Sequence, residues 1–180
     1  MAKVDVINKE IETPSEVTVK LSEDILSVKG PKGELVRRFS HPRVSMKLEG
    51  KTVVVHSDAP KRAEMGLAGT WVAHVKNMIL GVTDGFHYKM RIIYSHFPIK
   101  TSVRGKELVI ENFLGERHPR TAKIVDGVTA KISGDSITLE GNDKEKVGQT
   151  AANIEKATIV KGYDTRVFQD GIYLVKRGDR

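Results

Sequence analysis

The chain of 180 residues has no cysteine, which excludes disulfide bonds, thiolate metal sites and catalysis by a thiol. It has no apolar run near the ~20 residues that cross a bilayer. Its first dozen residues are polar and lack the apolar core of a signal peptide. We therefore expect a cytoplasmic protein with no membrane partner.

Motifs of catalysis are also lacking. The six histidines are scattered, and none belongs to an H-E-x-x-H motif or stands at ligand spacing from a pair of carboxylates. No G-x-S-x-G motif occurs. The sequence predicts no catalytic residue, no metal site, no cofactor and no enzyme. The alternative is an undetected hydrolase, which would lose its turnover when one histidine is removed.

What the sequence does have is positive charge. Lysine and arginine number 30 against 23 acidic residues, a net charge of +7. Up to Asp84 there are 13 basic and 11 acidic residues, so +2, and the remainder has 17 against 12, so +5. Because basic side chains that neutralise phosphates release counterions, a polyanion is the favoured partner.

The order strand, hairpin, hairpin, helix occurs twice. At a shift of 84 residues Val44 matches Val128 and Gly50 matches Gly134, and at a shift of 82 Gly66 matches Gly148. A duplication explains this agreement. We expect an α+β protein with two similar small domains, 1–85 and 86–180, each an antiparallel sheet packed against one main helix.

The first copy predicts strands at 17–21, 25–28, 34–39, 44–48 and 51–55, after an extended lead-in at 1–16. A helix is predicted from Asp58 and Pro60 to Leu80, ended by Gly81 and Gly85. The segment 88–94 is predicted to join the copies. The inward positions of the helix are Ala63, Leu67, Trp71, Val75 and Met78.

The second copy predicts a helix from Lys144 to about Ala157, capped by Asn142 or Asp143 and stopped by Gly162. Its buried stripe would be Val147, Ala151 and Ile154. A strand-like run, 166–177, follows. Within it Gln169-Asp170-Gly171 is typical of a turn or bulge, Phe168, Ile172 and Leu174 face the core, and Tyr173, Lys176 and Arg177 stay accessible.

Two features favour RNA contact. Another stripe of the second helix carries only cations and amides, Lys146, Gln149, Asn153 and Lys156, with Glu155 close to it. This stripe suits phosphate and sugar contacts as well as an ordinary solvated face. Arg117, His118 and Arg120 lie on a predicted hairpin tip. There they suit bidentate phosphate contact or a solvated loop.

The stretch Gly141–Ile154, followed by Lys161-Gly-Tyr163 and Arg166–Lys176, resembles the signature of the sixth protein of the large ribosomal subunit. The resemblance is to the archaeal and eukaryotic branch, whose eukaryotic member is the ninth protein. Asn112–Arg117 and Asn77–Phe86 also resemble that family. Bacterial members have a Pro-x-Pro-Tyr-Lys-Gly-Lys-Gly loop where this chain has Tyr163–Phe168, so contacts of the bacterial loop are not carried over.

The resemblance implies a structural protein of the ribosome in the cytoplasm. It implies binding to large-subunit rRNA, not DNA, close to the sarcin–ricin loop and the stalk base, with neighbouring ribosomal proteins and translation factors nearby. The second domain would make most of the rRNA contact. With Arg177 added beside the tail, the expected contacts on helix and tail are Lys144, Lys146, Gln149, Asn153, Lys156, Lys161, Gly162, Arg166, Lys176 and Arg177.

A free-standing RNA-binding regulator with tandem modules is the alternative function. Such a protein binds single-stranded RNA through exposed aromatic side chains. The chain has only ten Phe, Tyr and Trp residues, which counts against it.

Overall fold

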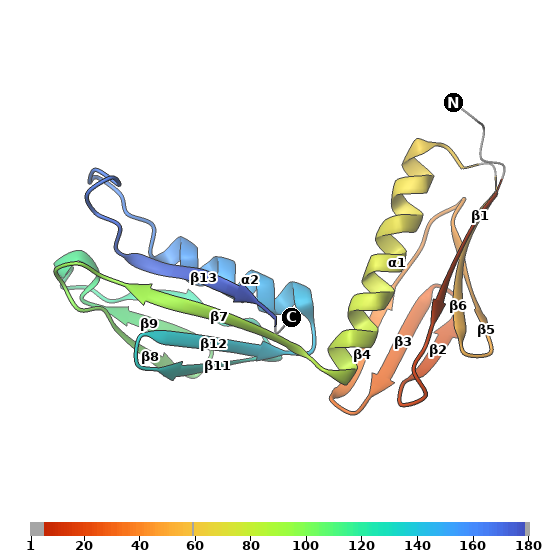
Figure 1. Cartoon of the computed structure of the whole chain (residues 1–180), viewed down its shortest axis with the longest axis horizontal. Helices are drawn as coiled ribbons and strands as arrows, with labels where there is room; N and C mark the ends of the chain where they lie inside the picture. Colours follow the sequence, from red (N-terminus) through yellow and green to blue (C-terminus); the bar gives the residue numbers. More distant parts are fainter. Residues whose placement is uncertain (1–5, 59, 179–180) are drawn as a thin grey trace. The chain divides into compact units, whose positions relative to one another are not determined.

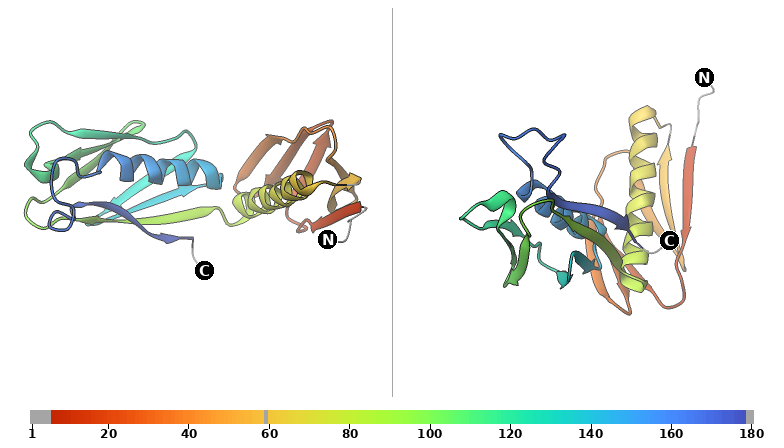
Figure 2. Two further views of the ribbon diagram at one scale, coloured as in Figure 1. Left: turned by 90° about the horizontal axis from the view of Figure 1, so that it is seen from above. Right: turned by 60° about the vertical axis from the view of Figure 1, so that its left-hand side comes forward.

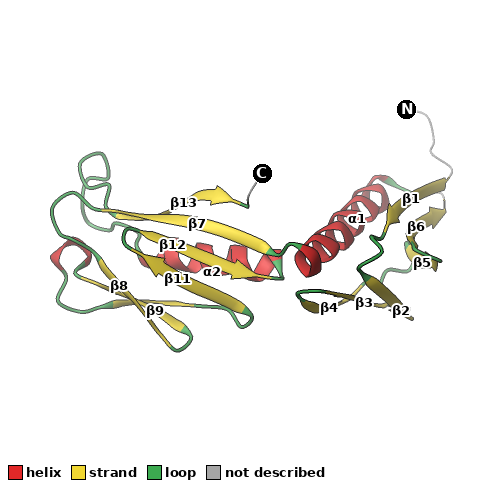
Figure 3. Cartoon of the chain, turned by 60° about the horizontal axis from the view of Figure 1, so that its bottom comes forward, coloured by secondary structure: helices red, strands yellow, loops and turns green. Residues whose placement is uncertain are grey.

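A computed structural model describes residues 6–58 and 60–178 of the chain. The backbone divides into two compact units, Met1–Gly85 and Phe86–Arg180, shown in Figure 1 and coloured by secondary structure in Figure 3. Each unit has one long helix and two antiparallel sheets. The predicted α+β class is therefore confirmed, although the strands of each copy form two sheets rather than one. No helix in the described residues is long and apolar enough to span a membrane.

The described residues of the first unit, 6–58 and 60–85, form six strands and one helix. One sheet has the order β1-β6-β5 and the other the order β2-β3-β4. The elements are β1 (Val6–Glu12), β2 (Thr18–Ser22), β3 (Ile25–Gly30), β4 (Gly33–Arg38), β5 (Ser45–Glu49), β6 (Thr52–Asp58) and α1 (Arg62–Thr83).

Helix α1 closes the core of this unit. Its buried stripe includes Ala68, Trp71, Val75 and Met78, and Trp71 packs edge-on against Phe39 at 5.4 Å between ring centroids. The prediction for Ala63 is wrong, because the helix begins only at Arg62 and Ala63 is exposed.

The end of α1 follows one of the two predicted glycines. Gly85, at φ 72°, donates its N–H to the Leu80 carbonyl at 3.0 Å and closes the helix. Gly81 instead lies buried inside the helix. The predicted start at Asp58 and Pro60 is wrong, because Asp58 is the last residue of β6 and the helix begins at Arg62, with Lys61 as its N-cap residue.

Residues 1–16 are not simply a lead-in. Residues 6–12 form β1, which pairs with β6 along its length, from Val6 opposite Asp58 to Glu12 opposite Thr52. Ile11 is the anchoring position and is 4% exposed. As an edge strand β1 has one paired side only, so its sequence is largely polar. Residues 1–5 lie outside the described part of the chain.

The second unit repeats the arrangement and adds a strand. Its four-stranded sheet has the order β11-β12-β7-β13 and its smaller sheet the order β10-β9-β8. A 3₁₀ turn at Phe113–Gly115 follows β9. The elements are β7 (Phe86–Ile93), β8 (Lys100–Arg104), β9 (Glu107–Glu111), β10 (Arg120–Lys123), β11 (Val128–Ser133), β12 (Ser136–Gly141), α2 (Lys144–Ala157) and β13 (Gly171–Arg177).

The predicted joining segment 88–94 is largely strand β7. It pairs with β12 on one side and β13 on the other, as β1 pairs with β6 in the first unit. Met90 at its centre is fully buried. What the sequence predicted as a connection is therefore the first strand of the second copy.

Helix α2 has the predicted bounds. Asp143 caps it, accepting the Glu145 N–H at 2.9 Å, and Val147, Ala151 and Ile154 are buried. Gly162 does not stop it. The helix ends at Ala157, where the Thr158 hydroxyl donates to the Glu155 carbonyl at 3.2 Å and accepts the Ile172 N–H at 3.1 Å.

The tail is strand only from Gly171 onward. Ile172 is fully buried, Phe168 and Leu174 are half-buried, and Tyr173, Lys176 and Arg177 are exposed as predicted. The irregularity in the pairing of β13 with β7 lies between Leu174 and Lys176. It does not lie at the predicted Gln169–Gly171.

Candidate nucleic-acid interface

Helix α2 packs between β13 and β10 of the second unit, and two side chains fix how it is turned. The Glu155 carboxylate accepts the Leu174 N–H of β13 at 2.9 Å. Asn153 Nδ2 donates to the Lys123 carbonyl at the end of β10, also at 2.9 Å. Glu155, next to Lys156 in the chain, thus points toward β13, and Asn153 of the predicted cation-and-amide stripe points to the β10 side.

The stripe itself is mostly exposed. Lys146, Gln149 and Lys156 are exposed and Asn153 is half-buried. Gln149 Nε2 donates to Asn153 Oδ1 at 2.9 Å, so both polar groups of Asn153 are already used inside the unit. Asn153 therefore holds the stripe in place, while Lys146, Gln149 and Lys156 present it to solvent.

A lysine cluster lies near the start of α2. Lys106 Nζ is 2.6 Å from Asp126 Oδ1. The Lys106 hydrogen bond, helped by the charges of Lys106, Lys123 and Lys146, holds the pKa of the Asp126 carboxyl below its usual range. Only Lys106 pairs with Asp126, while Lys123 and Lys146 act on the same carboxylate by their charge alone. Glu107 lies opposite Lys123 in the β9–β10 pairing, so three lysines exceed two acidic residues by one charge. Sequence reasoning missed Lys106 and Lys123, since they come from segments that meet only in the fold.

At the other end of α2 three loops meet, 94–99, 112–119 and 158–170, which we call the loop end (Figures 1 and 2). The Ser95 N–H donates to Asp170 Oδ1 at 3.2 Å, linking the first loop to the third. Asn112 Nδ2 donates to the Pro98 carbonyl at 3.1 Å, linking the second to the first. The loops are therefore braced against one another.

Arg120 links the second loop to the third. Its guanidinium donates to both carboxylate oxygens of Glu116, at 2.8 and 2.6 Å, and to the carbonyls of Ala157 and Ile159, at 2.9 and 3.1 Å. It also lies 4.3 Å from the centre of the Phe113 ring. The expectation of an exposed tip is wrong for Arg120, which starts β10 with a side chain only 24% exposed.

The same ion pair shifts the titration of Glu116. The hydrogen bond from Arg120, reinforced by its charge, holds the pKa of the Glu116 carboxyl below its usual range. Of the predicted tip only Arg117 and His118 are exposed. They lie in a loop that contains a 3₁₀ turn.

The structure brings some predicted residues together and separates others. With Lys156, the loop end carries Arg117, His118, Lys161, Gly162 and Arg166. Lys144 is at the opposite end of α2, 5.9 Å from the Phe86 ring. The 14 residues of the helix place its ends about 20 Å apart. Lys176 and Arg177 pair with Lys89 and Tyr88 on the β13 side, away from the stripe.

The loop end has five cations, Arg117, Arg120, Lys156, Lys161 and Arg166, against four carboxylates, Glu116, Glu155, Asp164 and Asp170, an excess of one positive charge. Glu116 is bound by Arg120, Asp170 by the Ser95 N–H and Glu155 by the Leu174 N–H. Asp164 accepts the Arg166 N–H at 3.0 Å and lies 4.0 Å from Arg166 Nε, so these two side chains form an ion pair. Within residues 6–58 and 60–178, Arg117, Lys156 and Lys161 take part in no ion pair. The β10 side of α2, from the lysine cluster to the loop end, is thus a positively charged strip.

Among the described residues no group of three or more histidine, aspartate or glutamate side chains has the arrangement of a metal site. Titratable side chains also meet outside the strip, in the second unit around Glu140, which lies 2.7 Å from Lys131 Nζ and 3.8 Å from His87 Nδ1, and in the first unit around His56. There His56 contacts Asn8 Oδ1 at 2.6 Å through Nδ1 and Asp58 Oδ1 at 3.0 Å through Nε2.

Comparison with known proteins agrees with the duplication and with the resemblance. The family model described as ribosomal protein L6 matches residues 13–85 and again residues 97–171. The chain is 47% identical over 174 residues to the large ribosomal subunit protein uL6 of Methanococcus vannielii, covering 97% of this chain and 96% of that protein. It is 49% identical over 174 residues to the protein of the same name from Methanothrix thermoacetophila, covering 97% and 99%.

Proposed function

The chain belongs to the ribosomal protein L6 family, and on that premise we propose that its second unit binds large-subunit rRNA through the positively charged strip along α2. The chain is a structural protein of the large ribosomal subunit and works as a scaffold. Its position beside the sarcin–ricin loop and the stalk base, where translation factors bind, is the finer part of the proposal and rests on the family resemblance.

One observation carries the proposal: on the β10 side of α2 Lys146, Lys156 and Arg117 are exposed and take part in no ion pair among the described residues, while Asp126 and Glu116 each pair with another cation. Lys146 and Lys156 are exposed at positions ten residues apart on the helix, so they lie about 15 Å from each other along its axis. Asp126 and Glu116, near the two ends, are bound to Lys106 and Arg120. A strip of this charge and length suits several successive phosphates of a folded RNA.

The residues of the strip have different tasks. Lys146, Lys156 and Arg166 contribute charge to phosphate contacts, and Arg117 can bind one phosphate with two parallel hydrogen bonds. Among the described residues the Gln149 carbonyl oxygen has no hydrogen-bond donor, so it can accept from a ribose 2′-hydroxyl, which distinguishes RNA from DNA. Asn153 and Arg120 hold the strip in shape instead of touching the RNA.

The first unit, 1–85, has a separate role in this proposal. Its sequence carries the smaller charge excess, +2 against +5. We assign it to the surface that faces neighbouring ribosomal proteins and translation factors, with 86–180 as the main rRNA-binding domain.

Co-sedimentation tests the proposal. The full chain is expected to sediment with large subunits and to stay bound after a wash at moderate salt. The wash should release a variant in which Lys146, Lys156 and Arg166 are all replaced by alanine. A soluble pool of the wild-type chain that binds single-stranded RNA and never sediments would favour the free-standing regulator.

A further inference from the structure

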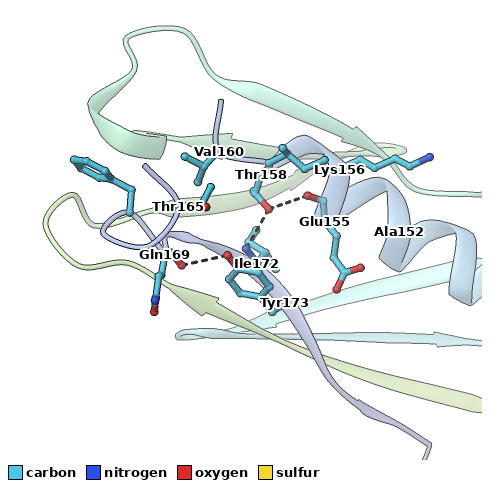
Figure 4. A pocket seen from close by; sticks show the side chains of 11 residues that line it. Ala152, Glu155, Lys156, Thr158, Val160, Thr165, Gln169, Ile172 and Tyr173 are labelled. Atoms are coloured by element: carbon cyan, nitrogen blue, oxygen red, sulfur yellow. Dashed lines mark hydrogen bonds between the residues drawn. The ribbon is translucent and has the colours of Figure 1, made fainter. Parts of the chain in front are cut away.

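A hollow of about 540 Å³ lies between the end of α2, the loop 158–170 and the start of β13 (Figure 4). Its volume falls within the ~300–1,000 Å³ typical of small-molecule sites. Most of its lining is apolar. The apolar and aromatic lining residues are Ala152, Ile159, Val160, Phe168, Ile172 and Tyr173.

The walls of this hollow are held in place before anything binds. The Thr158 hydroxyl bridges the Glu155 carbonyl and the Ile172 N–H, and the Tyr173 hydroxyl donates to the Gln169 carbonyl at 3.2 Å (Figure 4). The Asp164 carbonyl accepts the N–H groups of Val167 and Phe168. A flat apolar group can therefore enter without leaving these polar groups unpaired.

We propose that the hollow holds one unstacked base of the rRNA. This deepens the proposed function, since it names the part of the RNA that this end of the strip binds. Tyr173 is 43% exposed and offers a ring on which a base can stack, as aromatic side chains do for unpaired bases in RNA recognition. Thr165 and Gln169, also in the lining, offer hydrogen-bonding groups to the base edge.

The charges around the hollow favour an RNA base as its occupant over an apolar segment of a neighbouring protein. Lys156 lines the hollow, and Lys161 and Arg166 lie on the loop that forms one wall. Glu155, which also lines the hollow, accepts the Leu174 N–H, and Asp164 accepts the Arg166 N–H and lies 4.0 Å from Arg166 Nε. An apolar opening beside Lys156 and Lys161, which take part in no ion pair among the described residues, fits a nucleotide, whose base enters while its phosphates stay outside.

The test measures binding of the full chain to a transcript of the complete large-subunit rRNA at several salt concentrations. The variant Tyr173→Ala removes the stacking surface, and Thr165→Trp fills the hollow while keeping the tyrosine. Tyr173→Phe keeps the ring. Tyr94→Ala is the matched control, because Tyr94 is 40% exposed and belongs to the loop end but does not line the hollow.

We expect Tyr173→Ala and Thr165→Trp to weaken binding about tenfold, within the range measured for removal of one stacked base. The slope of log affinity against log salt should stay unchanged, because both variants keep every phosphate-binding side chain. Tyr173→Phe and Tyr94→Ala should bind within about twofold of wild type. Base-specific chemical probing should show one base that is protected by the wild type and reactive with Tyr173→Ala.

Wild-type affinity for both Tyr173→Ala and Thr165→Trp would overturn the base site, and so would an equal loss in Tyr94→Ala. Suppose that both variants bind the transcript like wild type, and that in intact subunits Thr165→Trp loses a cross-link from Tyr173 to a neighbouring protein. The hollow then holds a protein segment. In each of these cases the proposal that the strip binds rRNA is kept if replacing its lysines and arginine still weakens binding. That proposal is wrong if these variants bind as tightly as wild type.

Discussion

Replacing Arg120 by alanine tests whether this arginine braces the loop end or binds RNA. The change removes two hydrogen bonds to the carbonyls of Ala157 and Ile159 at the end of α2, the paired hydrogen bonds to Glu116, and the packing against Phe113. Water can reach the freed carbonyls, so each of those bonds contributes about 1 kcal/mol.

The exposed ion pair to Glu116 adds at most about 1 kcal/mol and the ring contact about 0.5–1 kcal/mol. Because these contributions are coupled and not strictly additive, we expect Arg120→Ala to lower the free energy of unfolding of the second unit by about 2–4 kcal/mol. For a unit of this size the melting temperature should fall by on the order of 10–20 °C.

Thermal unfolding followed by calorimetry measures this effect. Arg120→Lys should recover only part of the stability, because an ammonium group cannot span Glu116 and the two carbonyls at once. Arg117→Ala is the matched control, since Arg117 is exposed and takes part in no ion pair among the described residues; it should unfold within about 0.5 kcal/mol of wild type. If Arg120→Ala melts like Arg117→Ala and flattens the salt slope of rRNA binding, Arg120 is a phosphate ligand and the bracing role is wrong.

Two further predictions concern stability. At Gly30 an added Cβ would lie 2.7 Å from Val82 Cγ2 and 2.8 Å from the Val82 carbonyl oxygen, so Gly30→Ala should destabilise the first unit by about 1–3 kcal/mol. Gly66 lies in open space on α1, so Gly66→Ala should stabilise the unit by about 0.5–1 kcal/mol. Equal denaturant midpoints for the two variants would contradict this packing. Because the folded pKa of Glu116 lies below its usual value of 4.5, its contribution is present above that pH and disappears as pH falls through the folded value. Wild type should therefore lose at most about 1 kcal/mol of its free energy of unfolding as the pH falls through this range, and Glu116→Gln should not lose it. Parallel curves of unfolding free energy against pH for the two proteins would refute the stabilising role of this ion pair.

The sequence predicts the helices of this fold better than its edge strands. Val147, Ala151 and Ile154 recur at helical spacing because all three face one core, so local periodicity suffices. Strand β1 buries Ile11 and pairs through its backbone with β6 alone. Its side chains therefore carry little signal. The sequence does not reveal strand β7 for another reason. Its place between β12 and β13 depends on pairings with residues distant in sequence.

The site could be predicted only in part, for related reasons. The stripe on α2 follows from spacing along one helix, and Lys146 and Lys156 are exposed there as expected. Which residues of the loop end point outward depends on contacts between loops, and these turned Arg120 inward. Lys106 joins the strip through its ion pair with Asp126, and Lys123 through the hydrogen bond of its carbonyl with Asn153. Nothing near these lysines in the sequence indicates that meeting.

The role of the strip is tested most directly by the salt dependence of rRNA binding for a variant in which Lys146, Lys156 and Arg166 are all alanine. A matched variant removes three exposed lysines of the first unit, Lys20, Lys29 and Lys47. We predict weaker binding by the first variant, with a slope of log affinity against log salt reduced by roughly 0.7–0.9 for each phosphate that the variant no longer neutralises, and little change in the second. Unchanged affinity and slope in the first variant, or an equal weakening in the second, would contradict the assignment of rRNA binding to the strip.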